Sequence, residues 1–135
     1  MVRLTASGRP RFQVSRVELR RQGPSFTFDT VRAMRRRHPG RDFAFIVGAD
    51  TVREIPTWHR WRDLLKAVPF IVISRPGYRL RPLRGFESRF RLVPIRGLRL
   101  SSSGLRKRLR RGRGVGNSLA PRVRAYIRGA GLYRS

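Results

Sequence analysis

Residues 43–78 read FAFIVGADTVREIPTWHRWRDLLKAVPFIVISRPGY, and this stretch decides the fold class. Its two short apolar runs, Phe43–Val47 and Phe70–Ile73, are typical of strands that are covered on both faces of a parallel sheet. A parallel pair needs a crossover of about a dozen residues or more, and a helix predicted near Trp61–Val68 can supply it. Ligands of such sheets bind beyond the carboxyl ends of the strands. The stretch therefore predicts a nucleotide-handling α/β domain with its site at these ends.

The segment before this stretch predicts one further strand and one helix. Residues Phe12–Leu19 alternate apolar and polar side chains, as an edge or half-buried strand does. Ser25 or Thr27 can cap a helix that carries Asp29 in its first turn, and residues 38–40, His-Pro-Gly, end it. We expect the beginning of this helix to face the preceding turn.

The segment after this stretch predicts strands first and helices last. Phe90–Ile95 is expected to form a strand and Leu98–Leu100 a last short one. Two amphipathic helices are predicted within residues 103–133, the second beginning at Pro121. The length fits one domain over residues 1–135, with a parallel sheet flanked by helices.

The chain is strongly basic, with 33 Lys and Arg against 7 Asp and Glu and a formal net charge of +26. Clustered basic residues neutralise phosphates, so this charge allows a polynucleotide-binding surface. However, Lys66 and Lys107 are the two lysines, and the arginines are scattered along the whole chain. Such a ratio is what a GC-rich genome imposes on surface positions, and we favour that interpretation. Anionic small substrates are compatible with both.

Cysteine is absent, which excludes disulfides, thiolate metal sites and a cysteine nucleophile. No apolar run approaches the roughly 20 residues that a membrane helix needs, and the first ten residues lack the apolar core of a signal peptide. We therefore expect a cytoplasmic protein without a membrane partner.

Six motifs between Arg21 and Tyr133 resemble, in order and spacing, those of the bacterial nicotinate-nucleotide adenylyltransferase family. They are R-x-G-P-S-F-T-F-D-T, F-I-V-G-A-D, P-T-W, R-P-G-Y, S-S-S-x-L-R and A-Y-I-R-x-x-G-L-Y. The resemblance implies a Rossmann-like nucleotidyltransferase fold. It also implies transfer of AMP from ATP, bound with Mg²⁺, to nicotinate mononucleotide, giving deamido-NAD and pyrophosphate. Such direct transfer needs positioning and charge stabilisation but no protein nucleophile.

The resemblance implies four residues that bind nicotinate mononucleotide. Trp58 would stack on the nicotinate ring. The alternative is a core aromatic, which its loop-like neighbours Pro56, Thr57, His59 and Arg60 make less favoured. Thr27 would offer helix-terminal amides to the nicotinate carboxylate, the alternative being an ordinary cap. His59 would help to hold that carboxylate through its backbone or ring, or is plain surface. Arg75 would contact phosphate, or is one more arginine in an arginine-rich chain.

Five further residues are implied for ATP. Asp50, after Gly48, is expected near the ribose or adenine, the alternative being a cap for the next turn. Ser102, Ser103 and Arg106 would bind the ATP phosphates at the beginning of a helix. Their alternative is a serine cap followed by a solvated basic face.

One family feature is missing from the sequence. Family members begin with a strand and a loop reading G-x-F-D-P-x-H-x-G-H, whose histidines contact the ATP phosphates, and this chain has no such motif. His38 and His59 are its two histidines, and neither is close to a glycine-rich turn. We therefore expect an N-terminally truncated fold without catalytic residues, which retains part of the nicotinate site but turns over ATP negligibly.

Two other functions stay open at this point. One is a small RNA- or DNA-binding module that uses Arg106–Arg113, although its aromatic residues lie in apolar runs away from the arginines. The other is a non-catalytic remnant that folds poorly, because a lost central strand leaves an unpaired sheet edge.

Overall fold

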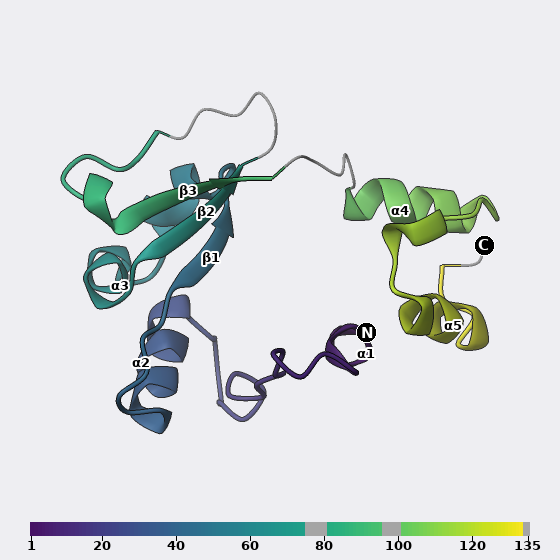
Figure 1. The fold of residues 1–135 in the computed structure, drawn as a ribbon, viewed down its shortest axis with the longest axis horizontal. Helices are drawn as coiled ribbons and strands as arrows, with labels where there is room; N and C mark the ends of the chain where they lie inside the picture. Colours follow the sequence, from purple (N-terminus) through teal and green to yellow (C-terminus); the bar gives the residue numbers. More distant parts are fainter. Residues whose placement is uncertain (75–80, 96–100, 134–135) are drawn as a thin grey trace. The chain divides into compact units, whose positions relative to one another are not determined.

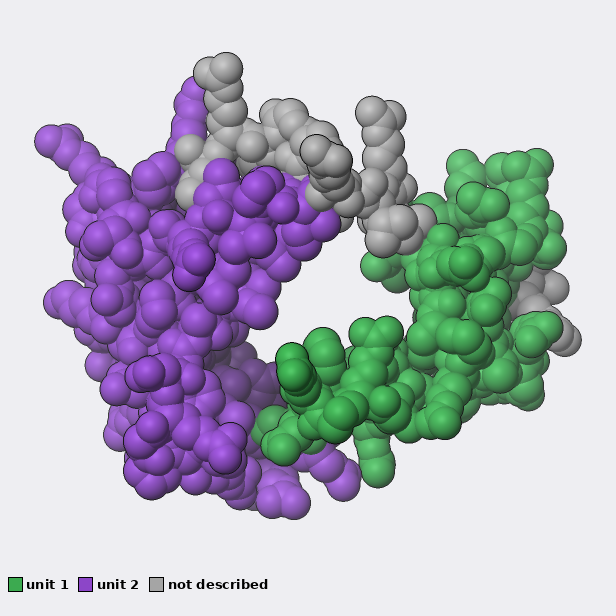
Figure 2. Space-filling model, viewed as in Figure 1, with its two compact units in different colours: residues 1–15, 98–135 green, residues 16–97 purple. Residues whose placement is uncertain are grey.

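The structure, a computed structural model, describes residues 1–74, 81–95 and 101–133. The chain divides into two compact units, each described here by itself (Figure 2). Unit 1 comprises Met1–Ser15 and Leu98–Ser135, and unit 2 comprises Arg16–Gly97. The strand expected at Leu98–Leu100 lies outside the described residues. The single domain expected over residues 1–135 stays a prediction.

Unit 2 contains a sheet of three parallel strands, as the sequence predicts (Figure 1). The strands are β1 (Phe45–Gly48), β2 (Phe70–Ser74) and β3 (Phe90–Pro94), in the order β1-β2-β3. The register aligns three phenylalanines across the sheet, Phe45 beside Phe70 and Phe70 beside Phe90. Their ring centroids lie 5.4 Å and 5.6 Å apart, in the range of favourable tilted aromatic pairs.

One face of this sheet carries the core. Val47 and Val72 lie in register on that face and are 7% and 0% exposed. Ile46 points to the opposite face and is 61% exposed, and Val93 is 37% exposed. The expectation that the strands are covered on both faces is therefore wrong for β1. The apolar run correctly indicated a parallel strand, but among the described residues nothing buries Ile46.

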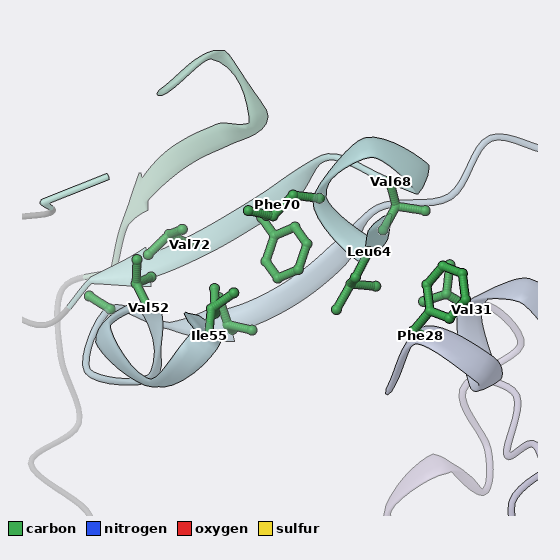
Figure 3. Close-up of a cluster of buried hydrophobic side chains, with 11 residues drawn as sticks. Phe28, Val31, Val52, Ile55, Leu64, Val68, Phe70 and Val72 are labelled. Carbon is green, nitrogen blue, oxygen red and sulfur yellow. The ribbon is translucent and has the colours of Figure 1, made fainter. Parts of the chain in front are cut away.

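The chain between β1 and β2 forms the crossover and fills the core (Figure 3). It consists of the 3₁₀ helix η1 (Thr51–Thr57) and the α-helix α3 (Trp61–Ala67). With about three residues per 3₁₀ turn, Val52 and Ile55 fall on one side of η1, and both are buried. The cluster of buried side chains is made of Phe28, Val31, Val47, Ala49, Val52, Ile55, Leu64, Leu65, Val68, Phe70 and Val72.

Helix α2 (Thr27–Arg37) packs against α3 and contributes Phe28 and Val31 to the core. Asp29 lies in its first turn and His38 ends it, as expected. The expected cap is wrong, because Phe26 occupies the N-cap position and no side chain makes a cap hydrogen bond.

The C-terminal end of α3 is held by two arginine side chains. Arg89 lies in the short 3₁₀ helix η2 (Glu87–Arg89), and its Nε and Nη2 donate to the carbonyl oxygens of Leu65 and Lys66 at 2.7 and 3.0 Å. Arg35 of α2 donates from Nη1 to the carbonyl of Ala67 at 3.1 Å. These carbonyls have no partner within the helix, so the guanidinium groups satisfy them.

The strand expected at Phe12–Leu19 is wrong. Residues 12–16 have no regular structure and 17–20 form a turn, with Phe12 61% and Leu19 79% exposed. Alternation of side chains marks a strand only where a neighbouring strand pairs with it, and none does among the described residues.

Unit 1 is helical and has a small core of its own. It contains α1 (Val2–Ala6), α4 (Ser102–Arg110), the 3₁₀ helix η3 (Gly116–Ser118) and α5 (Pro121–Gly129). The two helices predicted within residues 103–133 are thereby confirmed, the second beginning at Pro121. Its buried side chains are Val115, Val123 and Ile127. Within residues 1–74, 81–95 and 101–133, no helix is both long and apolar enough to span a bilayer.

Candidate functional site

Two segments of unit 2 meet at the beginning of α2. The Phe26 ring stacks on the His59 ring, with centroids 4.3 Å apart and planes at 29°. The Arg60 guanidinium lies over the Phe28 ring, 4.2 Å from its centroid. The structure thus brings together three of the residues predicted to bind nicotinate mononucleotide: Thr27 lies between Phe26 and Phe28, and Trp58 directly precedes His59.

Thr27 is the first residue of α2 and is half-buried. The amides of a helix's first turn have no acceptor within the helix, and the Phe26 side chain cannot accept a hydrogen bond. These amides are therefore directed outward from a helix end that favours anions. Thr27 itself does not act as the cap, which removes the alternative that the sequence left open for it.

Trp58 occupies the position that follows η1, where its amide donates to the carbonyl of Ile55 at 2.9 Å. Its ring is half-buried and meets the Phe45 ring edge-on, with centroids 6.0 Å apart and planes at 86°. The indole therefore packs against the core and also retains exposed surface. The indole can thus be held by Phe45 on one side and contact a ligand with its exposed part.

Gly48 and Asp50 lie at the carboxyl end of β1, where the fold class predicts a site. A Cβ built on Gly48 would fall within 3.0 Å of Asp50 Oδ1, so the carboxylate occupies the space beside the glycine. Asp50 is exposed and holds the N-cap position of η1, but its side chain makes no cap hydrogen bond. The alternative function of Asp50 as a helix cap is therefore not realised.

Arg75 lies outside the described residues. Strand β2 ends at Ser74, which is 7% exposed and whose carbonyl accepts a hydrogen bond from the Ile95 amide at 3.3 Å. The phosphate contact expected of Arg75 stays a prediction.

In unit 1, the serines at the beginning of α4 have different environments. Ser101 is the cap, and its Oγ accepts a hydrogen bond from the Gly104 amide at 3.0 Å. Ser102 and Ser103 are exposed in the first turn, and Arg106 is exposed one turn further on. The cap function thus belongs to Ser101, which leaves the hydroxyls of Ser102 and Ser103 free of that task.

The described residues offer no protein cage for a metal ion. Within residues 1–74, 81–95 and 101–133, no group of three His, Asp or Glu side chains is placed to hold one.

A cytidylyltransferase-like family model matches residues 1–108, and the chain belongs to that family. This confirms the fold class, a parallel sheet flanked by helices as in Rossmann-like nucleotidyltransferases. Curated relatives that it matches carry the name of the family that the motifs resemble. A protein of Geobacillus thermodenitrificans named "Probable nicotinate-nucleotide adenylyltransferase" is 38% identical over 98% of this chain and 60% of its own length. A protein of the same name from Thermus thermophilus is 39% identical over 99% of this chain and 70% of its own length.

Solved structures agree on the fold. The chain aligns with Plasmodium falciparum nicotinic acid mononucleotide adenylyltransferase complexed with APC, with a TM-score of 0.64 and 24% identity, over 83% of this chain and 60% of that one. The same enzyme complexed with NaAD gives a TM-score of 0.62. The chain thus spans about 60% of the length of several proteins that it matches. None of these similarities supports a nucleic-acid-binding function.

Sequence reasoning missed two residues that shape this region, Arg60 and Phe26. Asp63, three residues after Arg60, is a local signal for an ion pair at the beginning of a helix. The stacking of Phe26 on His59 depends on a contact between distant segments, which the sequence does not reveal.

Proposed function

We propose that this protein is of the kind that transfers AMP from ATP to nicotinate mononucleotide, producing deamido-NAD and pyrophosphate, and that the 135-residue chain binds the acceptor nucleotide but turns over ATP negligibly. The observation that carries the proposal is the meeting of the Thr27 helix end with the Trp58–His59 segment in unit 2. Membership of the cytidylyltransferase-like family and the names of its curated relatives support the same reaction.

The acceptor nucleotide combines the features that this region can recognise. Its nicotinate ring is a pyridinium cation, and an indole face attracts such a cation by about 0.5 to 2 kcal/mol. Its carboxylate is an anion, which the outward amides at the beginning of α2 can receive. The half-buried Trp58 can therefore stack on the cationic ring, and the uncapped first turn at Thr27 can receive the carboxylate of the same ring.

For ATP, the candidate residues are those that the sequence indicated. Asp50 beside Gly48 suits paired ribose hydroxyls, and Ser102, Ser103 and Arg106 suit phosphate oxygens. Mg²⁺ bound with ATP would neutralise developing phosphate charge. Arg75 remains our candidate for the phosphate of the acceptor, and a cytoplasmic location remains a prediction from the sequence.

The test is binding to the purified 135-residue chain, because the sequence has no G-x-F-D-P-x-H-x-G-H motif and turnover is expected to be negligible. We expect calorimetry to show that Trp58→Ala weakens nicotinate mononucleotide binding by about tenfold or more, while ATP binding changes little. Equal losses for both ligands would contradict the stacking function.

Nicotinamide mononucleotide is the matched control ligand, since it replaces the carboxylate by a neutral amide. We expect the chain to prefer the nicotinate form, because a helix N-terminus favours an anion. Equal affinity for the two would remove the carboxylate-binding function of the Thr27 turn, and no binding of either would overturn the proposed function.

A further inference from the structure

Arg60 combines three features that do not occur together at any of its neighbours. Its backbone lies in the left-handed region, with φ 53° and ψ 39°, where a non-glycine residue is uncommon. Its Nε and Nη2 both approach Asp63 Oδ2 at 2.8 Å. Its guanidinium also lies 4.2 Å from the centroid of the Phe28 ring. A strained backbone of a non-glycine residue persists where the surrounding contacts determine it.

The two side-chain contacts of Arg60 join different elements. Asp63 lies in the first turn of α3, whereas Phe28 lies in the first turn of α2 and is 8% exposed. Arg60 therefore bridges the two helices immediately after Trp58 and His59. The stacking of His59 on Phe26 forms a second contact between the same two segments.

Neither contact would be decisive alone. The Arg60 and Asp63 side chains are 47% and 44% exposed, and ion pairs of that exposure contribute little to stability. Their combination has a geometric effect: the carboxylate fixes the plane of the guanidinium, and the guanidinium fixes the turn against a buried ring. The turn that carries Trp58 is thereby set before any ligand arrives.

We propose that Arg60 is a positioning residue that holds the Trp58–His59 segment against the beginning of α2, so that the site for the pyridine ring is preformed. The inference rests on the proposed function for its ligand, whereas the ordering of the segment can be measured without one. Preforming a site lowers the ordering cost that binding would otherwise carry.

The first experiment measures the order of the segment without ligand. The chain has two tryptophans, so Trp61→Phe leaves Trp58 as the sole tryptophan, whose fluorescence can be excited selectively, and retains an aromatic ring against Phe86. In that background, we expect Arg60→Asn to raise the acrylamide quenching constant of Trp58 by about twofold, because Asn tolerates the left-handed backbone but lacks the guanidinium. Asp63→Asn should give a smaller rise.

Arg62→Asn is the matched control variant. Arg62 also lies over an aromatic ring, 4.3 Å from the centroid of Trp61, but among the described residues it makes no hydrogen bond, ion pair or ring contact with α2. In the Trp61→Phe background, Arg62→Asn should leave the acrylamide quenching constant of Trp58 unchanged. An unchanged constant in Arg60→Asn, or an equal rise in Arg62→Asn, would overturn the inference.

The second experiment measures the consequence for binding. We expect Arg60→Asn to weaken nicotinate mononucleotide binding by about three- to tenfold and Arg60→Lys by less, with ATP affinity unchanged in both. Urea unfolding in the same samples should show little change, which separates positioning from loss of the fold. If Arg60→Asn binds nicotinate mononucleotide as tightly as the parent protein does, the inference about Arg60 is overturned and the proposed function is not. A parent protein that fails to bind nicotinate mononucleotide would overturn the proposed function, and the quenching data would still decide the positioning by Arg60.

Discussion

The requirement for glycine at position 48 comes from the side chain two residues later. Gly48 is not among the glycines with positive φ, so another residue could adopt its backbone conformation. What excludes a side chain is the carboxylate of Asp50, whose Oδ1 occupies the place where a Cβ would lie. Gly48 therefore leaves the space that is occupied by the carboxylate of Asp50, a candidate ligand-binding residue.

This pairing predicts the outcome of a double-mutant cycle. Gly48→Ala should destabilise the protein by up to about 1 kcal/mol, because the added methyl group must displace the exposed carboxylate of Asp50. In an Asp50→Ala background the same substitution should cost much less. Urea unfolding of the four proteins measures the coupling. Costs that simply add would show that the carboxylate is not the obstacle.

At the scale of elements, α3 depends on arginines contributed by other parts of unit 2. Arg89 reaches the carbonyl of Leu65, which lies 24 residues earlier, and Arg35 reaches the carbonyl of Ala67. A short helix of 7 residues has little stability of its own, so its packing and its ends determine whether it forms. Two guanidinium groups at its negative end satisfy the carbonyls and complement the helix dipole.

Removal of the Arg89 side chain should therefore lower the free energy of unfolding by more than is usual for a partly exposed residue. We expect Arg89→Met, which keeps much of the aliphatic stem, to lower the free energy of unfolding by about 1.5 to 3 kcal/mol. Arg91→Met on neighbouring β3 is the control, because Arg91 is exposed and should change stability by less than about 0.5 kcal/mol. Similar losses in both variants, measured by urea unfolding, would contradict the capping function.

The beginning of α4 separates a structural serine from two candidate ligands. Ser101→Ala should cost about 1 kcal/mol of stability, because it removes the hydrogen bond to the Gly104 amide. Ser103→Ala should leave stability nearly unchanged while weakening ATP binding. Thermal unfolding and ATP titration of the two variants distinguish these functions. A loss of ATP binding in Ser101→Ala alone would reassign the phosphate contact to the cap residue.

At the scale of the whole molecule, the formal charge of +26 acts against the compact state through self-repulsion. Raising NaCl from about 50 to about 500 mM shortens the Debye length from roughly 14 to 4 Å and should raise the melting temperature by a few degrees. Differential scanning fluorimetry measures this, with KCl at equal ionic strength as the control for ion-specific effects. A melting temperature that stays flat or falls would show that repulsion is negligible.

The sequence predicts the sheet because parallel strands produce a local signal. Apolar runs that end in turn residues located β1 and β2 within two residues, and the crossover followed from the length of chain between them. The Phe12–Leu19 segment shows where this logic fails, since the pattern of one segment cannot supply a neighbouring strand. Which face of the sheet is buried likewise depends on elements that lie far away in the sequence.

The sequence indicated candidate site residues but not the residues that support them. The motifs indicated Thr27, Trp58 and His59, and the structure brings the two segments that carry them into contact through the rings of Phe26 and His59. Asp63 is a local signal for Arg60, but the contact of Arg60 with Phe28 and the contacts of Arg89 join residues far apart in the chain, which the sequence does not reveal. Because most of the arginines follow from the composition of the chain, the few that make a specific contact do not stand out in the sequence.

The arginine contacts at positions 35, 60 and 89 set a limit on how this polypeptide can be re-engineered. A worker who wanted a milder isoelectric point, for crystal growth or for magnetic resonance, would begin by exchanging guanidinium side chains for neutral or acidic ones. Most positions should tolerate that exchange, since surface substitutions usually alter stability little. These three should be spared, and lysine would not be an adequate substitute at Arg89, because an ammonium group lacks the planar fork that engages two carbonyl oxygens at once.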